Sequence, residues 1–479
     1  MVSGTLPAQA GFPGYEGLEH ARSCYDEAFS APDVPRPHYA RLLEGLAGVD
    51  LTLLAEATAR SIDRRGVRFR ALGGVVPFKR DPVPRIFARE EWERLAPGLV
   101  QRARALNAFA ADAYAERRIV ASGRVPARVL DGAEQLEPAM AGVAVPGGVY
   151  AGVLGLDLVR DADGTLKVLE DNVRTPSGLA YAEAACAVVD EVLPFDAEPR
   201  LGAPQRFGAL AEVLRSAAPE GVADPGVALL SDGPDNSAWW EHEQIAAALG
   251  IPIVTLEGLE LSRERLYARI DGHRRRLDVV YRRTDEDRLT DPSGRPTALG
   301  EAVLQPMRAG RLGCVNAPGG GVADDKLVHA YVEEMIRFYL DEEPLLASVR
   351  TYDLLEPAQR EECLERIDEM VVKPRSGLGG HGVIVCAHAR PEDRDRAARQ
   401  IAAHPERFVA QELVALSHHP TVRGGALEPR HVDLRPFVLS AGGRVVALPG
   451  GLTRVALAAG ALVVNSSQDG GAKATWVLA

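Results

Sequence analysis

The chain has 479 residues and a formal net charge of −12, with 46% hydrophobic and 25% charged residues. These values are typical of a globular protein with several domains, and they exclude disordered and fibrous classes. The acidic balance disfavours binding of nucleic acid or of an anionic membrane over a broad surface, so any phosphate site must be local.

The cysteines and the N-terminal segment indicate the compartment. Five cysteines lie far apart, with no CxxC pair and no Cys/His cluster. This spacing favours reduced thiols over a disulfide framework or a zinc site. The N-terminal segment has neither the basic residues nor the apolar stretch of a signal peptide. Because the longest uncharged run, residues 138–156, is interrupted by Pro and Gly, a membrane helix is not expected either. We therefore expect a cytoplasmic protein.

Residues 1–130 are predicted to be mainly helical. Ala103, Leu106 and Phe109 repeat with the helical period, with Arg and Asp on the other face. This pattern predicts a helix over about 90–118, with Trp92 and Phe109 in the core.

Residues 131–200 are predicted to contain a β-hairpin. Apolar stretches at 149–158 and 166–169 flank the sequence Asp161-Ala162-Asp163-Gly164. A turn that contains Asp-Gly between two such stretches is typical of a hairpin.

A small α/β domain is predicted over residues 215–320. Strand and helix patterns alternate there, which favours a parallel sheet covered by helices. The predicted strands are 227–230, 253–256 and 279–281, and the predicted helix is 237–249.

Residues 321–479 begin with a predicted helix at 324–340 and continue as β-rich sequence punctuated by glycine. The predicted strands are 370–373, 383–386, 408–411, 434–439, 445–448 and 461–464. Several candidate site residues lie on these strands or directly after them.

Three oxygen-bearing side chains are expected on one face of the predicted hairpin. Alternation along the second strand puts Glu170 and Asn172 on the same face, and Asp157 lies on the partner strand. Magnesium binds carboxylate and amide oxygens of this kind and leaves its other positions to water and substrate phosphates. The alternative is a solvated hairpin whose acids only flank the turn.

A glycine-rich loop follows the predicted strand that contains Lys373. Its glycines are Gly377, Gly379, Gly380 and Gly382. The residues after the loop are β-branched, which disfavours a dinucleotide fingerprint, and the P-loop and kinase signatures are missing. Strand, glycine loop and strand favour a flap over nucleotide phosphates, with an ordinary tight hairpin as the alternative. The strand lysine favours the flap, because an unpaired lysine is costly to bury.

Lys326 follows Asp324 and Asp325 at the start of a predicted helix. The two acids complement the helix dipole, so capping accounts for them. A lysine at this position opposes the dipole, which indicates either an anionic neighbour or a solvated surface side chain.

The order of these elements resembles the circularly permuted ATP-grasp family, similar to the synthetase half of glutathionylspermidine synthase. In other ATP-grasp ligases an Asp and a Glu-x-Asn hairpin come last, whereas here Asp157, Glu170 and Asn172 come first. The remaining elements follow in the usual order and are Lys326, Lys373, the flap Gly377 to Gly382, Gln411 and Glu412, Asp433 and Arg435, Arg454, and Asn465 with Gly470 and Gly471. Further stretches, such as EDNVRTPSG at 170–178, extend the resemblance over nearly the whole chain.

The resemblance implies an α/β (α+β) fold in which the circularly permuted ATP-grasp core carries a small Rossmann-like α/β domain and an N-terminal helical region. Residues 131–200 would form the metal-binding part of the core, and residues 321–479 its nucleotide-binding lobes. The implied activity is that of a ligase that joins a small-molecule or peptide carboxylate to an amine. It would use ATP and Mg²⁺, act through an acyl phosphate, and release ADP and phosphate.

The resemblance also implies roles for individual residues. The implied nucleotide ligands are Lys326, Lys373, Gly377, Gly379, Gly380, Gly382, Gln411, Glu412 and Leu413, and the implied metal ligands are Asp157, Glu170 and Asn172. Arg454 would stabilise the transferred phosphoryl group or a developing oxyanion. Candidates for binding the substrate are Arg174, Ser177, Arg282 and Arg283, since arginine pairs well with a carboxylate.

Two stretches depart from the family pattern. Lys79-Arg80 interrupts one motif, and small apolar residues around Cys186 follow Tyr181 where many relatives carry Glu-Asn-Arg. Both departures concern the expected substrate side.

Two alternative functions remain. One is a phosphotransferase on the same scaffold, and the other is a non-catalytic nucleotide-binding partner of another enzyme.

Overall fold

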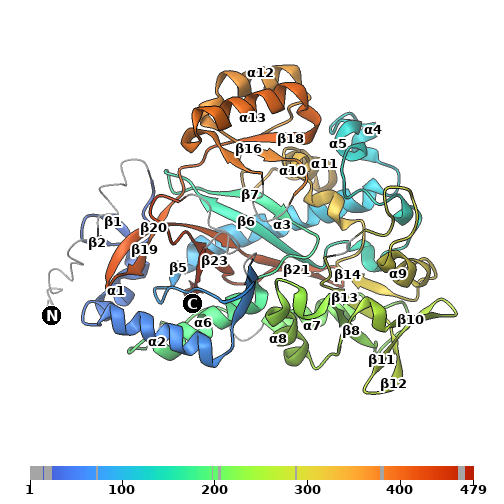
Figure 1. The fold of residues 1–479 in the computed structure, drawn as a ribbon, viewed down its shortest axis with the longest axis horizontal. Helices are drawn as coiled ribbons and strands as arrows, with labels where there is room; N and C mark the ends of the chain where they lie inside the picture. Colours follow the sequence, from blue (N-terminus) through green and yellow to red (C-terminus); the bar gives the residue numbers. More distant parts are fainter. Residues whose placement is uncertain are drawn as a thin grey trace.

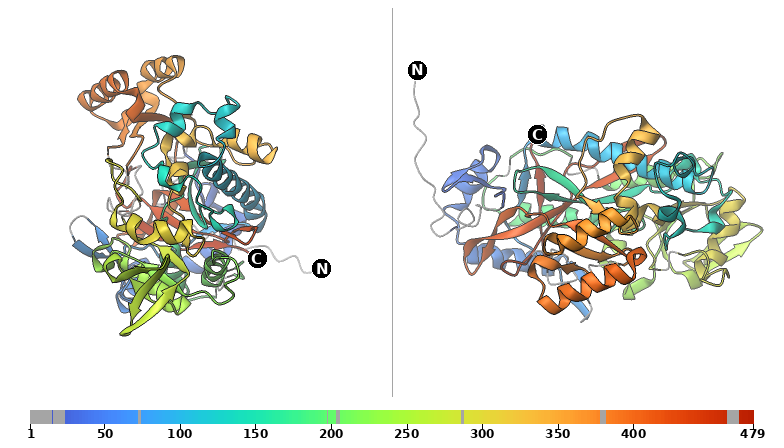
Figure 2. Two further views of the ribbon diagram at one scale, coloured as in Figure 1. Left: turned by 90° about the vertical axis from the view of Figure 1, so that its right-hand side faces the viewer. Right: turned by 90° about the horizontal axis from the view of Figure 1, so that it is seen from above.

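The computed structural model describes residues 15, 24–71, 74–196, 198–202, 206–285, 288–377, 382–461 and 470–479. A central antiparallel sheet crosses the middle of the molecule, with a small lobe above it and a parallel α/β domain to its lower right (Figure 1). The small lobe projects from the rest of the molecule when it is seen from the side (Figure 2).

The central sheet joins segments from distant parts of the sequence. The hairpin of β6 (Val153–Arg160) and β7 (Leu166–Asn172) pairs with strands near the C-terminus, so that Leu158 lies opposite Leu434 and Gly155 opposite Phe437. The other strands are β19 (His418–Arg423), β20 (Ala426–Arg435), β21 (Phe437–Ala441), β22 (Arg444–Ala447), β23 (Leu452–Val455) and β24 (Gly471–Lys473). Their spatial order is β22-β21-β6-β20-β23-β24, with β7 beside β6 and β19 beside β20.

The sequence predicted much of this sheet, with one error. The hairpin is confirmed, and β22 confirms the strand expected at 445–448. The single strand expected at 434–439 is wrong, because Pro436 separates β20 from β21 and proline has no N–H to donate to a strand ladder. The strand expected at 461–464 falls almost entirely outside the described residues.

The small lobe is an antiparallel sheet covered by two helices. Its strands are β15 (Thr351–Tyr352), β16 (Met370–Pro374), β17 (Ile384–Val385) and β18 (Phe408–Glu412), and its helices are α12 (Pro357–Glu365) and α13 (Pro391–Ala403). Buried side chains from both layers, such as Leu354, Val372 and Ile401, form a separate core. The strands expected at 370–373, 383–386 and 408–411 are thus confirmed.

The α/β domain has a parallel sheet in the order β14-β13-β8-β9. Its elements are α7 (Arg206–Ser216), β8 (Val227–Leu230), α8 (Trp239–Leu249), β9 (Ile253–Val254), β13 (Val279–Arg282), α9 (Ala298–Arg308) and β14 (Gly313–Val315). The expected alternation of strand and helix is confirmed here. An antiparallel meander of β10 (Leu259–Ser262), β11 (Arg265–Ile270) and β12 (His273–Leu277) was not predicted, because its many arginines obscure the apolar pattern.

The N-terminal region contains both helices and short strands. The helices are α1 (Ala40–Leu46), α2 (Leu51–Arg64), α3 (Arg89–Ala113), α4 (Arg118–Ala121) and α5 (Ala127–Asp131), and the strands are β1 (Phe29–Ala31), β2 (Val34–Pro35), β3 (Arg68–Ala71), β4 (Gly74–Pro77) and β5 (Arg85–Phe87). Strand β5 pairs in parallel with β25 (Thr475–Val477). Helix α3 confirms the long helix expected at 90–118, and Trp92 and Phe109 are buried as expected.

The helix expected at 324–340 is divided in the structure. It consists of α10 (Lys326–His329) and α11 (Val332–Leu340), because Tyr331 has non-helical backbone angles. The Tyr331 hydroxyl donates a hydrogen bond to Asp353 at 2.8 Å at this break. A further helix, α6 (Leu179–Val192), packs beside the central sheet against β23 and β24.

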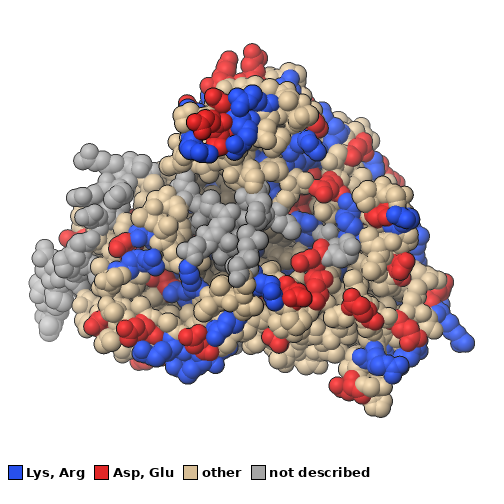
Figure 3. Space-filling view, in the orientation of Figure 1, with Lys and Arg blue, Asp and Glu red and all other residues tan. Residues whose placement is uncertain are grey.

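The visible surface carries both signs of charge. On the face shown in Figure 3, the described Lys and Arg side chains are interspersed with Asp and Glu, with no continuous basic stripe. Within the described residues, none of the helices is both long and apolar enough to cross a membrane.

Glu27 ties the N-terminal segment to the central sheet. Its Oε1 accepts hydrogen bonds from Arg85 Nη2 at 2.5 Å, Arg160 Nε at 3.0 Å and Ser417 Oγ at 2.6 Å. Burial disfavours the charge, but Arg160 and Arg85 outweigh it and lower the pKa of the Glu27 carboxyl to about 2. The carboxylate therefore connects β5, the end of β6 and the segment before β19.

Replacing Glu27 should change the acid sensitivity of the fold. A carboxyl whose pKa is lowered by folding stabilises the protein above its unfolded pKa, and this stabilisation disappears as the pH falls through the folded pKa. The lowering of the Glu27 pKa from 4.5 to about 2 corresponds to about 3 kcal/mol of folding stability. Urea unfolding measures the free energy of unfolding at each pH. Between about pH 5 and about pH 2, we expect this free energy to decrease less in Glu27→Gln than in the parent. The variant is already less stable at neutral pH, because two guanidinium groups lose their partner.

Glu93→Gln is the matched control, because Glu93 pairs with Arg89 on the exposed surface of α3. This variant should keep the parent's pH dependence. If Glu27→Gln also kept it, the carboxyl would not be the buried titrating group described here.

Candidate functional site

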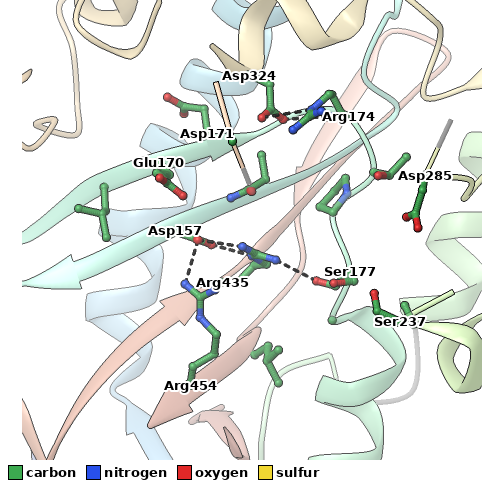
Figure 4. A pocket seen from close by; sticks show the side chains of 18 of the residues that line it. Asp157, Glu170, Asp171, Arg174, Ser177, Ser237, Asp285, Asp324, Arg435 and Arg454 are labelled. Carbon is green, nitrogen blue, oxygen red and sulfur yellow. Dashed lines mark hydrogen bonds and ion pairs between the residues drawn. The ribbon is translucent and has the colours of Figure 1, made fainter. Parts of the chain in front are cut away.

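A cavity of about 740 Å³ lies between the small lobe, the β6–β7 hairpin and the parallel domain. Asp157, Glu170, Arg435 and Arg454 point toward one another at one side, while Ser237 and Asp285 lie across the space (Figure 4). The charged group comprises Asp157, Glu170, Lys326, Lys373, Arg435 and Arg454. An apolar wall comprises the aromatic side chains of Phe69, Phe78 and Tyr181 together with Leu452.

Glu170 lies between two lysines that come from different parts of the fold. Its Oε1 is 3.8 Å from Lys326 Nζ and 3.7 Å from Lys373 Nζ. Burial disfavours the charged carboxylate, but Lys373 and Lys326 outweigh it and lower the pKa of Glu170. Burial likewise lowers the pKa of Lys373, and the Glu170 charge opposes that shift. The charges of Glu170 and Lys373 therefore support each other.

Each lysine is positioned by regular structure. Lys373 is on β16 and only 6% exposed, whereas Lys326 is the first residue of α10 and donates a hydrogen bond to the Gly377 carbonyl at 3.1 Å. Asp325 caps α10, accepting from the Leu327 amide at 2.9 Å. Arg375 Nε lies 2.8 Å from both oxygens of that same carboxylate, so the cap also ties α10 to the end of β16.

Asp157 is held by two arginines. Its carboxylate accepts from Arg435 Nε at 2.6 Å and Nη2 at 2.8 Å, and from Arg454 Nη2 at 2.8 Å. Arg454 Nε also donates to Asp433 at 2.9 Å. Burial opposes the Asp157 charge, but the two arginines lower the pKa of this carboxyl to about 2. Strands β6, β20 and β23 thus meet in one ionised network.

The hairpin residues provide a donor set that suits magnesium. Asp157 lies opposite Glu170 in the β6–β7 register, and Asn172 is two residues further along β7. Among the described residues, the Asn172 Nδ2 is buried and has no hydrogen-bond partner. Two carboxylates and one amide are hard oxygen donors. Within the described residues there is no group of three or more His, Cys, Asp or Glu that could hold a metal.

The residues expected to hold adenine differ in orientation. Gln411 lines the cavity, its Nε2 donating to the Leu169 carbonyl at 3.2 Å, and its buried Oε1 has no partner in the described part of the chain. The Glu412 carboxylate instead accepts from the Tyr352 hydroxyl at 3.1 Å. The Leu413 amide donates to the Glu369 carbonyl at 2.9 Å. Glu412 and Leu413 are not among the cavity-lining residues.

The glycine loop is described only in part. Gly377 lines the cavity with φ of 141°, a backbone angle that favours glycine, while Gly382 is not among the lining residues. Gly379 and Gly380 lie outside the described residues, as does Asn465.

The expected substrate arginines have protein partners. Arg174 Nε lies 3.5 Å from Asp324. Arg282 Nε donates to the Asn316 carbonyl at 3.3 Å, and Arg282 does not line the cavity. Ser177 lines the cavity, and its carbonyl accepts from Arg435 at 3.3 Å.

Arg283 belongs to a buried network that the sequence did not reveal. Its Nη2 lies 3.2 Å from Glu241, and its Nη1 donates to the Pro176 carbonyl at 2.8 Å. The Glu241 carboxylate also accepts from the amides of Gly178 and Ala180, each at 2.9 Å. Glu241 therefore occupies the N-terminus of α6. No motif signals this arrangement, because Glu241 is 42 residues from Arg283 and more than 60 residues from the start of α6.

A second buried network lies behind Glu170. Asp171 accepts from Arg102 Nε at 2.6 Å and from His329 Nδ1 at 2.7 Å. No sequence pattern predicts this contact, because Asp171 looks like one more acidic residue of the hairpin and His329 like an ordinary helix residue.

Comparisons with known proteins agree with this architecture. Residues 84–456 match the family model described as circularly permuted ATP-grasp type 2. A Frankia alni protein named "Putative glutamate--cysteine ligase 2-3" is 43% identical over 466 residues, covering 95% of this chain and 54% of that protein. An uncharacterized protein of Synechocystis sp. is 40% identical over 465 residues, covering 95% of this chain and 97% of that protein. The chain thus spans about half the length of the Frankia relatives that it matches.

A solved structure shares the fold. A glutathione synthetase-like effector from Globodera pallida, in its apo form, matches with a TM-score of 0.58 and 15% identity, over 90% of this chain and 98% of that one. The expected fold class is confirmed by this likeness and by the family match. With its early hairpin paired to C-terminal strands, the chain belongs to the circularly permuted ATP-grasp family.

Proposed function

We propose that this protein is an ATP-dependent ligase that joins a carboxylate to an amine through an acyl phosphate and releases ADP and phosphate. The observation that carries the proposal is Glu170 between Lys326 and Lys373 at the wall of a large cavity. Two cations and a carboxylate in this arrangement suit a triphosphate and its metal ion. Membership in the ATP-grasp family also supports an ATP-dependent ligase.

In this proposal Lys326 and Lys373 neutralise the nucleotide phosphates, and the loop with Gly377, Gly379, Gly380 and Gly382 covers them. Gln411 offers its Oε1, which has no hydrogen-bond partner among the described residues, to the adenine. Glu412 and Leu413 do not line the cavity, and their backbone amides already donate within the small lobe and to the segment before it. The side chain of Glu412 is already engaged with Tyr352, which is why we assign it no direct contact.

Asp157, Glu170 and Asn172 would hold magnesium, which would offset the negative charge of the phosphates. This chain's own residues prepare the donors. The two arginines keep the Asp157 carboxylate ionised, and the two lysines do so for Glu170.

The chemical steps require positioning rather than a protein nucleophile. An oxygen of the substrate carboxylate attacks the γ-phosphorus, the bond to the bridging oxygen breaks, and ADP leaves. The amine then attacks the acyl carbon, phosphate departs, and the amine proton passes to solvent. Arg454, fixed by Asp433 and Asp157, would stabilise the phosphoryl group or the oxyanion of the tetrahedral intermediate.

The substrates would occupy the cavity beyond the charged group. Arg174, Ser177 and Arg283 line that space, but both arginines are already paired, so we expect them to shape the site more than to carry a substrate charge. The name of the Frankia alni relative makes glutamate and cysteine the first pair to test. None of the five cysteines forms a disulfide bond within the described residues, which fits a reducing compartment such as the cytoplasm.

The proposal predicts ADP release that requires Mg²⁺, ATP, a carboxylate and an amine together. Pools of amino acids, short peptides and polyamines provide the substrates. We expect Glu170→Ala to lower turnover by about a hundredfold or more, because a ligand of the magnesium ion is lost. Hydroxylamine should trap the acyl phosphate as a hydroxamate. ADP release with transfer to a hydroxyl group and no hydroxamate would instead indicate a phosphotransferase.

Replacing Lys373 tests the nucleotide site separately from the chemistry. We expect Lys373→Ala to raise the Kd for Mg·ATP by about tenfold or more, equivalent to about 1.4 kcal/mol. Lys167→Ala is the control, because Lys167 is on β7 but pairs with Asp161 in the turn. Isothermal titration calorimetry measures both. An unchanged Kd in Lys373→Ala would contradict the assignment.

A further inference from the structure

Helix α10 is too short to hold itself in place. It contains only Lys326–His329, and an isolated helix of this length is not stable without tertiary contacts. Its first residue is the lysine that faces Glu170 and its last is a buried histidine. The position of Lys326 therefore depends on what holds the two ends of this helical turn.

The N-terminal end is held through Asp325. This carboxylate caps the helix and receives Arg375 Nε at 2.8 Å on each oxygen. Arg375 follows Lys373 by two residues. The cap thus ties Lys326 to the strand that carries the second lysine.

The C-terminal end is held through His329. Its Nδ1 lies 2.7 Å from Asp171 Oδ2, and Arg102 Nη2 lies 2.8 Å from the same oxygen. Arginine only donates and an ionised carboxylate only accepts, so the proton between His329 and Asp171 belongs to Nδ1. The three side chains are between 1% and 5% exposed. This contact ties Lys326 to the strand residue next to Glu170.

We propose that the hydrogen bond from His329 to Asp171 is a positioning contact that sets Lys326 against Glu170 for Mg·ATP binding. The inference rests on the proposed function and adds a residue to it. Asp171 lies between Glu170 and Asn172 on β7, so this contact ties the C-terminal end of α10 to the strand that carries two of the proposed metal ligands. Outer contacts of this kind commonly control metal affinity by about tenfold to a hundredfold.

The geometry assigns His329 no direct role in the reaction. Its Nε2 is buried and has no hydrogen-bond partner among the described residues, and its other nitrogen is committed to Asp171. A side chain that supplies only the Nδ1 donor should therefore replace it. Asparagine places its amide nitrogen close to the position of Nδ1, whereas leucine keeps the approximate volume and removes the donor.

The experiment compares His329→Asn and His329→Leu with the parent in the full chain, by calorimetric titration of Mg·ATP well below the melting temperature of each. We expect the Kd of His329→Leu to rise about tenfold or more and that of His329→Asn to stay within about twofold of the parent. His419→Leu is the control. His419 lies on β19, outside the cavity, and is also fully buried. Its ring nitrogens are hydrogen-bonded to the Pro420 carbonyl and the Tyr39 hydroxyl.

The control should lower the melting temperature without changing the Kd, which separates general destabilisation from positioning. An unchanged Kd in His329→Leu, or an equal rise in His329→Leu and His419→Leu, would overturn the inference while leaving the proposed function intact. Failure of the parent itself to bind Mg·ATP would instead contradict the proposed function.

Discussion

The charge balance around Glu170 is the constraint on which the rest of the site depends. Burial disfavours the Glu170 carboxylate, and the two nearby lysines offset that cost and lower its pKa. Lys373 comes from the small lobe, Lys326 from α10, and Glu170 from the central sheet. The fold must therefore bring three separate elements to within about 4 Å of one point.

The connectivity shows how this is achieved. The hairpin that carries Asp157 and Glu170 pairs with strands near the C-terminus, and Asp157 is clamped by Arg435 and Arg454 from those strands. A chain permuted in this way can keep the same spatial site although the order of its elements has changed, because the sheet register and the ion pairs do not depend on which loop is cut. The buried network of Glu27 adds a further connection between the N-terminal segment and the sheet.

Local patterns in the sequence were sufficient for the elements that read as regular strands and helices. The Asp-Gly turn predicted the hairpin, and the alternation around β8 and α8 predicted the parallel domain. The order of Lys326, Lys373 and the hairpin acids indicated the family. The networks of Glu241 with Arg283 and of Asp171 with His329 could not be predicted, because each joins residues distant in sequence with no spacing rule. The split of α10 from α11 was missed for a related reason, since propensity alone favours one continuous helix.

The central claim is that the nucleotide and its metal ion bind between the two lysines and the β6–β7 hairpin. Crystals grown with Mn²⁺ and a non-hydrolysable ATP analogue test it most directly, through the anomalous signal of manganese. The account predicts an anomalous peak within coordination distance of the Glu170 and Asp157 oxygens, with the triphosphate contacting Lys326 and Lys373. A nucleotide bound elsewhere, or a metal peak away from the hairpin, would contradict it.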